Sequence, residues 1–413
     1  MLKEQAILIG CHTGKQSEES FHTSMDELKA LALTVNAEVV ETFIQKRDQI
    51  HSALYIGTGK VEEIKEFVSE QEIDIAIVNS ELSPSQARNL SEHLEIKVLD
   101  RTQLILDIFA MRARTKEGKL QVELAQLEYL LPRLHGQGVA LSRLGGGIGT
   151  RGPGETKLET DRRHIRRRIT EIKRAIDQVV KQRQQYRERR KKNSAFQISI
   201  VGYTNAGKST LFNRLTQTES LAEDKLFATL DPMTRKITLP SGFQPLISDT
   251  VGFIQELPTT LIAAFRSTLE EVIEADFILH VVDCSNRHYV EHEKTVHEIL
   301  NELGAGNIPI LTVYNKSDLN SESFIPYTTP HILMSALDNE DLHRLKLTIE
   351  QTLMDVWESY EVKLKSSKGK LINQLKRDTI ITTETFNEDD ETYVIEGFVS
   401  KDSPLYTNIT QSE

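Results

Sequence analysis

The chain has 413 residues, a formal net charge of −11 and two cysteines, Cys11 and Cys284. At about 100–200 residues per domain, this length predicts two to four domains, each able to bury a core. Two distant cysteines exclude a disulfide-rich scaffold, and no apolar run approaches the ~18 residues that a membrane-spanning helix needs. We therefore expect a cytoplasmic protein without a membrane span, monomeric in solution.

The first hundred residues alternate short apolar segments with helical patterns. The apolar segments cover 6–10, 38–44, 73–79 and 97–100, and the helical patterns begin at Asp26, Val61, Pro84 and Thr102. This alternation predicts a small βα amino-terminal domain, residues 1–114, with a parallel sheet. Within it, the motif IGTGK at 56–60 follows a strand and opens a helix. Such a turn can hold an anion on backbone N–H groups, so a structural turn and a second nucleotide site both stay open.

The next two segments have the spacing of a coiled coil. Apolar residues step by three, four or seven at Leu120, Leu124, Leu127, Leu131 and Leu134, and again at Leu158, Ile165, Ile169, Ile172, Ile176, Val179 and Tyr186. These seams predict an antiparallel coiled-coil hairpin over 115–192, with Pro132 kinking or ending the first helix. The second helix is basic, because 157–192 holds 15 Lys or Arg against 5 Asp or Glu. A basic arm in an acidic chain favours nucleic acid as a partner.

The two predicted helices are joined by 135–156, which contains eight glycines and has no apolar periodicity. We expect a loop at the tip of the hairpin, whose glycines allow close approach to a partner. Positive side chains in and beside this loop are the predicted RNA contacts: Arg143, Arg151, Arg162 and Arg163. A flexible linker without RNA contacts is the alternative.

The strongest motif begins at Ile198, where a strand, a loop and a helix read ISIVGYTNAGKSTLFNRL. The loop matches G-x-x-x-x-G-K-[ST] through Gly202, Gly207, Lys208 and Ser209. Backbone N–H groups of such a loop wrap nucleotide phosphates, the lysine reaches the β- and γ-phosphates, and the serine hydroxyl coordinates Mg²⁺. The predicted nucleotide contacts in this loop are Gly202, Tyr203, Thr204, Asn205, Ala206, Gly207, Lys208, Ser209 and Thr210.

Two further segments complete the predicted phosphate site. FATLDP at 227–232 supplies Thr229, expected to be the second protein ligand of Mg²⁺, and Phe227, expected beside the nucleotide. PLISDTVG at 245–252 supplies Asp249 on the Mg²⁺ side and Gly252, whose N–H can donate to the γ-phosphate. Together they predict a site that closes over the terminal phosphate.

Two later motifs predict guanine recognition. ILTVYNKSDL at 310–319 ends a strand in Asn315, Lys316 and Asp318, and HILMSAL at 331–337 adds Ser335 and Ala336. The Asp318 carboxylate can accept hydrogen bonds from the N1–H and 2-amino groups of guanine, and a backbone N–H near Ala336 would meet the guanine O6. Adenine would leave a buried polar group unpaired, at a cost of about 1–3 kcal/mol. GTP with Mg²⁺ is therefore the predicted ligand.

With these motifs the chain resembles the HflX family of translational GTPases over roughly residues 1–356. The likeness is carried by GGGIGTRGPGETKLETDRR, the most specific motif, and by GYTNAGKSTLFNRL, FATLDPMTRK, DTVGFI and NKSDL. It implies an α/β multidomain fold in which a Ras-like P-loop GTPase domain, 193–356, follows the βα domain and the hairpin. It also implies binding to the 50S subunit and its 23S rRNA, and splitting or recycling of 70S ribosomes under stress. The tail, 357–413, predicts a small α+β carboxy-terminal domain.

Phe253 follows Gly252, where many GTPases have a glutamine that orients the attacking water. An apolar ring cannot do this, so another residue, a bound ion or a partner must. In GTPases similar to this one, an asparagine matching Asn205 marks those that coordinate K⁺, although Asn205 could also only shape the loop. The predicted catalytic residues are therefore Lys208, Thr229, Gly252 and Asn205.

Two other functions stay open. One is a signalling or RNA-modification-associated GTPase whose partner is a protein or tRNA. The other is an ATP-dependent RNA-remodelling protein whose amino-terminal domain binds ATP through IGTGK. Stimulation of GTP hydrolysis by large subunits discriminates the first, and nucleotide binding by residues 1–192 discriminates the second.

Overall fold

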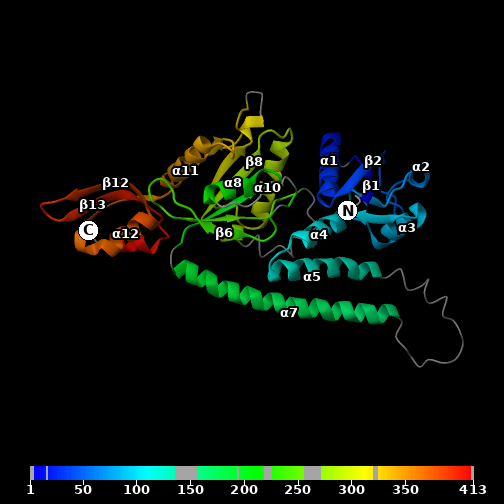
Figure 1. Cartoon of the computed structure of the whole chain (residues 1–413), viewed down its shortest axis with the longest axis horizontal. Helices are drawn as coiled ribbons and strands as arrows, with labels where there is room; N and C mark the ends of the chain where they lie inside the picture. The colour runs from blue at the N-terminus through cyan, green and yellow to red at the C-terminus, as the bar shows by residue number, and fades with distance from the viewer. Residues whose placement is uncertain are drawn as a thin grey trace. The chain divides into compact units, whose positions relative to one another are not determined.

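The computed structural model describes residues 4–14, 17–134, 157–192, 195–217, 226–227, 229–254, 271–319 and 324–410 (Figure 1). The chain forms two compact units. Unit 1 is made of Met1–Val180, Lys225–Phe227 and Gln255–Arg266, and unit 2 of Lys181–Asp224, Ala228–Ile254 and Ser267–Glu413. The finer division into four domains stays a prediction. None of the described helices is long and apolar enough to cross a membrane.

Unit 1 begins with a parallel sheet of strand order β2-β1-β3-β4. Its elements, in chain order, are β1 (Glu4–His12), α1 (Glu18–Thr34), β2 (Ala37–Lys46), α2 (Thr58–Glu70), β3 (Ile75–Val78), α3 (Pro84–Leu94), β4 (Lys97–Asp100) and α4 (Arg101–Arg112). Strand β3 is buried along its whole length, as expected for a parallel sheet covered by helices on both faces. The predicted βα repeat is confirmed.

Helix α1 begins earlier than the sequence predicted, at Glu18 instead of Asp26. The Ser17 side chain accepts a hydrogen bond from the Ser20 N–H at 3.1 Å and thereby caps the helix. The first turns are also anchored by Phe21, which is 2 % exposed. The Ser17 cap and the buried Phe21 thus extend the helix toward the N-terminus, before the residues whose apolar spacing predicted it.

The IGTGK turn has a structural explanation. The Gly57 N–H at the start of α2 donates to Gln45 Oε1 at 2.8 Å, and the Gly57 carbonyl accepts from the N–H groups of Lys60 and Val61. The backbone N–H and carbonyl of Gly57 therefore already have hydrogen-bond partners within the protein. This pairing favours a structural turn over a second nucleotide site.

The middle of the chain forms a hairpin from α5 (Lys116–Arg133) and α7 (Lys157–Lys192), which lie side by side and run in opposite directions (Figure 1). Ion pairs join the helices. Arg168 contacts both carboxylate oxygens of Glu123 at 2.6 and 2.9 Å, and Lys173 lies 2.8 Å from Glu128. These pairs are exposed to solvent, so each contributes little to the free energy of folding. Their main effect is to favour this pairing of the two helices over others.

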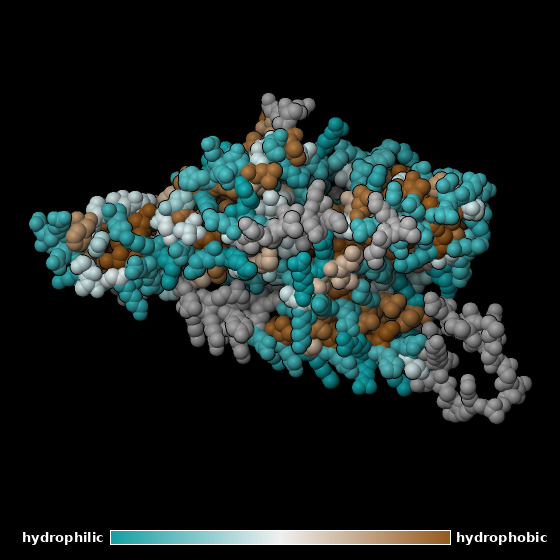
Figure 2. All heavy atoms as spheres, viewed as in Figure 1, coloured by the Kyte–Doolittle hydropathy of each residue, from teal (hydrophilic) through white to brown (hydrophobic). Residues whose placement is uncertain are grey.

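The apolar seam of the hairpin supplies the stabilisation. Ile172 is 1 % exposed, and Ile165, Ile169 and Ile176 are half-buried, as the heptad spacing predicted. Hydrophobic residues gather between the two helices, and hydrophilic residues cover the outer side of the coloured part of α7 (Figure 2). Helix α5 runs through Pro132 and ends at Arg133. The expected effect of Pro132, a kink or a stop, stays a prediction.

Unit 2 is built on a six-stranded sheet of order β10-β9-β8-β5-β7-β6, in which only β6 is antiparallel to its neighbour. Its elements are β5 (Gln197–Gly202), α8 (Lys208–Thr216), β6 (Met233–Lys236), β7 (Leu246–Asp249), β8 (Phe277–Asp283), α10 (Tyr289–Glu302), β9 (Ile310–Asn315), η2 (Ser317–Leu319), β10 (His331–Leu333) and α11 (Asn339–Met354). The carboxyl ends of its parallel strands meet at one edge, where open α/β sheets bind ligands. This is the predicted Ras-like P-loop domain.

The tail forms the predicted α+β structure. It contains β11 (Glu358–Lys365), η3 (Ser366–Lys368), α12 (Gly369–Asp378), β12 (Ile380–Asn387), β13 (Thr392–Val399) and α13 (Pro404–Thr410), with an antiparallel sheet of order β11-β13-β12. Strand β12 has mostly exposed side chains. Trp357 packs edge-on against Phe196 and Phe243, with ring centroids 5.2 and 5.3 Å away, and so joins the tail to the core of unit 2.

Candidate nucleotide-binding site

The loop between β5 and α8 has backbone conformations that require its glycines. Gly202 and Gly207 have φ values of +152° and +92°, which strain other residues. A Cβ atom at Gly202 would collide with the Val281 carbonyl, and one at Gly207 with the Asn315 side chain. The two glycines therefore let the loop pack closely on neighbouring strands, with the N-terminus of α8 at its end to receive an anion.

Lys208, the first residue of α8, has a buried side chain. Its Nζ donates to the Tyr203 carbonyl at 2.7 Å inside the loop. Burial lowers the pKa of Lys208 to about 8, while the Asp249 carboxylate opposes this shift and Lys316 adds to it. A Cβ atom at Gly252 would lie 2.9 Å from Lys208 Nζ, so this glycine allows the close approach. The amine is therefore held where a phosphate can displace the carbonyl.

Three side-chain oxygens converge next to Lys208. Ser209 Oγ lies 2.7 Å from Thr229 Oγ1, which donates to Asp249 Oδ2 at 2.7 Å. Burial raises the pKa of Asp249, against the hydrogen bond from Thr229 and the charge of Lys208. Asp249 Oδ1 has no hydrogen-bond partner within the described part of the chain. A buried carboxylate with spare acceptor capacity beside two hydroxyls fits Mg²⁺, which takes oxygen ligands.

Asn315, at the end of β9, connects the phosphate loop to the predicted base pocket. Its Nδ2 donates to the Ala206 carbonyl at 2.9 Å, and its Oδ1 accepts from the Ala336 N–H at 2.9 Å. The Ser335 N–H donates to Asp341 Oδ2 at 2.8 Å. Both N–H groups near the expected position of guanine O6 are thus engaged by side chains of the protein, and Asn315 acts here as a brace.

The remaining base-side residues lie just after β9. Lys316 has a φ of +65°, and its Nζ lies 2.7 Å from Asp283 Oδ2 at the end of β8. Asp318 follows in η2 and is exposed. Its carboxylate can therefore receive a base edge from solvent. Asp283, which orients Lys316, has no motif of its own and was missed by sequence reasoning.

His292 on α10 is a second residue that the motifs did not predict. Its ring stacks flat on the ring of Tyr203 in the phosphate loop, with centroids 3.7 Å apart and planes 4° from parallel. Burial lowers the pKa of His292 to about 4, so the ring is neutral at pH 7. The contact depends on how α10 packs against the loop, which sequence spacing does not encode.

The two phenylalanines near the site are both buried. Phe253 is 3 % exposed, and its apolar ring has no group that could orient water. Its backbone carbonyl accepts from the Thr204 N–H at 2.8 Å. Phe227 belongs to unit 1, where its ring packs edge-on against Phe109 of α4 with centroids 4.6 Å apart. Its role in nucleotide binding stays a prediction. Asn205 is exposed, with a φ of +60°.

The predicted RNA contacts are only partly within the described residues. Arg143 and Arg151 lie outside them. Arg162 and Arg163 lie near the start of α7, the first half-buried and the second exposed. Further exposed arginines follow on the same helix at Arg166, Arg167 and Arg174.

Comparisons with known proteins cover most of the chain. Residues 22–110, 112–190 and 197–316 match the families described as GTP-binding GTPase N-terminal, GTP-binding GTPase Middle Region and 50S ribosome-binding GTPase. The chain is 56% identical over 409 residues to GTPase HflX of Alkalihalophilus pseudofirmus, covering 99% of this chain and 96% of that protein. GTPase HflX of Escherichia coli K12 is 40% identical over 393 residues, covering 94% and 91%. A solved GTP-binding protein of Sulfolobus solfataricus in complex with GDP is 27% identical, with a TM-score of 0.45, covering 84% and 98%.

Proposed function

The chain belongs to the HflX family and is a GTP-hydrolysing enzyme, and from this premise we propose that it binds the 50S subunit and splits or recycles 70S ribosomes under stress. The observation that carries the proposal is the presence, in one chain, of an assembled phosphate site and a long basic helix with its apolar seam turned inward. The family match described as 50S ribosome-binding GTPase supports the partner. The exposed arginines of α7 support contact with 23S rRNA.

The residues of the phosphate site divide the work of GTP hydrolysis. Lys208 supplies a positive charge to the β- and γ-phosphates, and the Gly252 N–H donates to the γ-phosphate. Ser209 and Thr229 would hold Mg²⁺ with the support of Asp249, and the ion when bound neutralises charge on the phosphate oxygens. Catalysis then rests on positioning and charge, and the docked ribosome or a K⁺ ion near Asn205 would supply the transition-state stabilisation that the Phe253 ring cannot.

Replacing Asp318 with asparagine should change the base preference. The carboxylate accepts hydrogen bonds from guanine N1–H and the 2-amino group, whereas an amide matches the edge of xanthine. We expect Asp318→Asn to lose about 5- to 150-fold in GDP affinity, which corresponds to about 1–3 kcal/mol for a mispaired polar group. The variant should also gain affinity for xanthosine diphosphate. Titration of both nucleotides measures this, with Asp338→Asn, an exposed helix cap, as control. Unchanged GDP affinity would remove Asp318 from the base pocket.

The arginines at the hairpin should govern binding to ribosomal particles. If Arg143, Arg151, Arg162 and Arg163 contact rRNA, their replacement by alanine should weaken binding to 50S subunits. Each lost phosphate contact should also lower the salt dependence, by roughly 0.7–0.9 in the slope of log K against log salt. Cosedimentation with 30S, 50S and 70S particles over a salt series, with GDP and a non-hydrolysable GTP analogue, measures both quantities.

A charge-matched control separates specific contacts from net charge. Four exposed lysines outside the hairpin can be replaced by alanine together: Lys29, Lys97, Lys236 and Lys294. This control should bind 50S subunits nearly as the wild type does, and both quadruple variants should keep their GDP affinity. Equal 50S binding by the arginine variant and the wild type at every salt concentration would instead support the flexible-linker alternative.

A further inference from the structure

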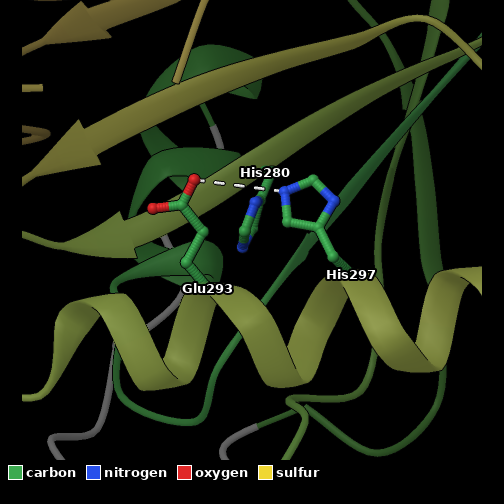
Figure 3. Close-up of side chains that lie close together, drawn as sticks. All are labelled: His280, Glu293 and His297. Atoms are coloured by element: carbon green, nitrogen blue, oxygen red, sulfur yellow. Dashed lines mark ion pairs between the residues drawn. The ribbon is translucent and has the colours of Figure 1, made fainter. Parts of the chain in front are cut away.

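A second cluster of chemically active side chains lies on the β8–α10 interface of unit 2 (Figure 3). His280 comes from the middle of β8, and Glu293 and His297 come from one face of α10, four residues apart. One potential ligand atom from each residue lies within 4.8 Å of the other two. His280 and Glu293 are 1 % and 3 % exposed, whereas the His297 side chain is 39 % exposed. The cluster is therefore closed on the core side and open at its rim.

The buried atoms of this cluster lack partners. His280 Nδ1 and Glu293 Oε1 have no hydrogen bond within the described residues, although Glu293 Oε2 accepts from the Tyr314 hydroxyl at 3.2 Å. His297 Nε2 lies 4.0 Å from Glu293 Oε1, too far for a good hydrogen bond. Burial lowers the pKa of His280 to about 3, so its ring is neutral and keeps a nitrogen lone pair. Unpaired buried polar atoms are uncommon, and two in one cluster call for a ligand.

We propose that His280, Glu293 and His297 bind a divalent transition-metal ion, preferentially Zn²⁺, that ties α10 to β8. Two imidazole nitrogens and one carboxylate oxygen are a ligand set that suits Zn²⁺, whereas Mg²⁺ and Ca²⁺ prefer oxygen. A pair of ligands four residues apart on a helix presents both to one ion. Water can occupy the fourth position from the exposed rim.

The spacing of the ligand atoms is compatible with this assignment. Tetrahedral Zn²⁺ with bonds of about 2.0–2.1 Å holds its ligand atoms roughly 3.3 Å apart, so the cluster must contract from its present separations. His297 can supply the movement, because its half-exposed side chain is not packed into the core. Tyr314, hydrogen-bonded to the second oxygen of Glu293, would orient the carboxylate.

The position of the cluster gives the ion a structural consequence. Helix α10 also carries His292, the ring that stacks on Tyr203 in the phosphate loop. An ion bound by His297 and Glu293 would hold the same helix against β8, only about one turn further along. The metal would therefore steady the support of the phosphate loop without touching the nucleotide.

Zinc titration of the full chain tests the proposal directly. After chelator treatment and with GDP bound, the wild type should take up one Zn²⁺ per chain in competition with a chromophoric chelator. Glu293→Gln and His297→Gln should each lower the Zn²⁺ affinity at least about tenfold. Replacing even a residue that only hydrogen-bonds to a metal ligand typically lowers the affinity by about 10–100-fold. The matched controls are Glu298→Gln, exposed on the same helix, and His343→Gln, exposed on α11, and both should keep wild-type affinity.

Two further readouts keep the test decisive. Zn²⁺ should raise the thermal unfolding midpoint of the wild type and both controls, but not of the two ligand variants. Bound Co²⁺ should give the wild type the intense visible absorption of a four-coordinate site, which settles the question even if a variant fails to fold. Equal Zn²⁺ affinity in the wild type and a folded ligand variant, or the weak absorption of six-coordinate Co²⁺, would overturn the proposal.

Discussion

Lys208→Ala should lower GTP turnover by a factor of about 10²–10³, the usual cost of removing one fixed donor from a developing negative charge. The lysine is buried beside Asp249 and donates to the Tyr203 carbonyl. Burial lowers the pKa of its amine only to about 8, so the amine is still mostly protonated at pH 7, and bound phosphates would stabilise the charge further. The measurement is single-turnover GTP hydrolysis at saturating nucleotide, because this separates the chemical step from weakened binding.

The control for this variant is Lys236→Ala, which removes an exposed lysine of the same unit. Its turnover should match the wild type within a factor of about two, as expected of a surface change. Thermal unfolding of Lys208→Ala should show a folded protein, because the Tyr203 carbonyl keeps the hydrogen bond from the Ala206 N–H at 3.3 Å. The loss of one hydrogen bond costs about 0.5–1.5 kcal/mol. A folded Lys208→Ala protein with wild-type turnover would remove the lysine from the catalytic site.

Asn205 should make GTP turnover depend on potassium. We expect turnover in KCl to exceed that in matched NaCl by at least about tenfold. This is a modest share of the roughly 10³–10⁵-fold increase in kcat that an arginine finger gives in other GTPases. The reason is charge: the transition state spreads negative charge over the γ-phosphoryl oxygens, and a fixed cation lowers its energy. Asn205→Ser should abolish the difference between the two salts. GTP turnover in each salt, with and without 50S subunits, is the measurement.

The conformation of Asn205 provides a sharper control. Its φ of +60° is well tolerated by asparagine and glycine but strained for serine. Asn205→Gly therefore preserves the loop while removing the side-chain oxygen. If potassium dependence is lost in both variants, the oxygen matters; if Asn205→Gly keeps it, the residue only shapes the loop. Equal wild-type rates in both salts would discard the ion altogether.

The phosphate site could be predicted from sequence because its chemistry restricts each position. A loop that wraps phosphates needs glycine where φ is positive, as at Gly207, and a lysine directly after it. The hydroxyls of Ser209 and Thr229 were likewise placed by spacing, and the structure brings them to 2.7 Å. In each case a local pattern and the end of a strand determine where the side chain lies.

The supporting contacts could not be predicted, because they depend on packing between segments distant in sequence. Nothing in the residues around His292 indicates that its ring lies on Tyr203, and the two hydrogen bonds of Asn315 appear only once β9 is placed beside the loop. The packing of the Phe227 ring on Phe109 was likewise not predictable from its motif, and its contact with the nucleotide stays a prediction.

The central claim, that this GTPase works on the large ribosomal subunit, is tested most directly by GTP turnover of the full chain at increasing concentrations of purified 50S and 30S subunits. Phe253 leaves the protein without a water-orienting glutamine, so turnover should be slow without particles. We expect a saturable increase of at least about tenfold with 50S subunits in KCl and none with 30S subunits. The same slow rate with 50S subunits, with 30S subunits and without either would contradict the proposed function.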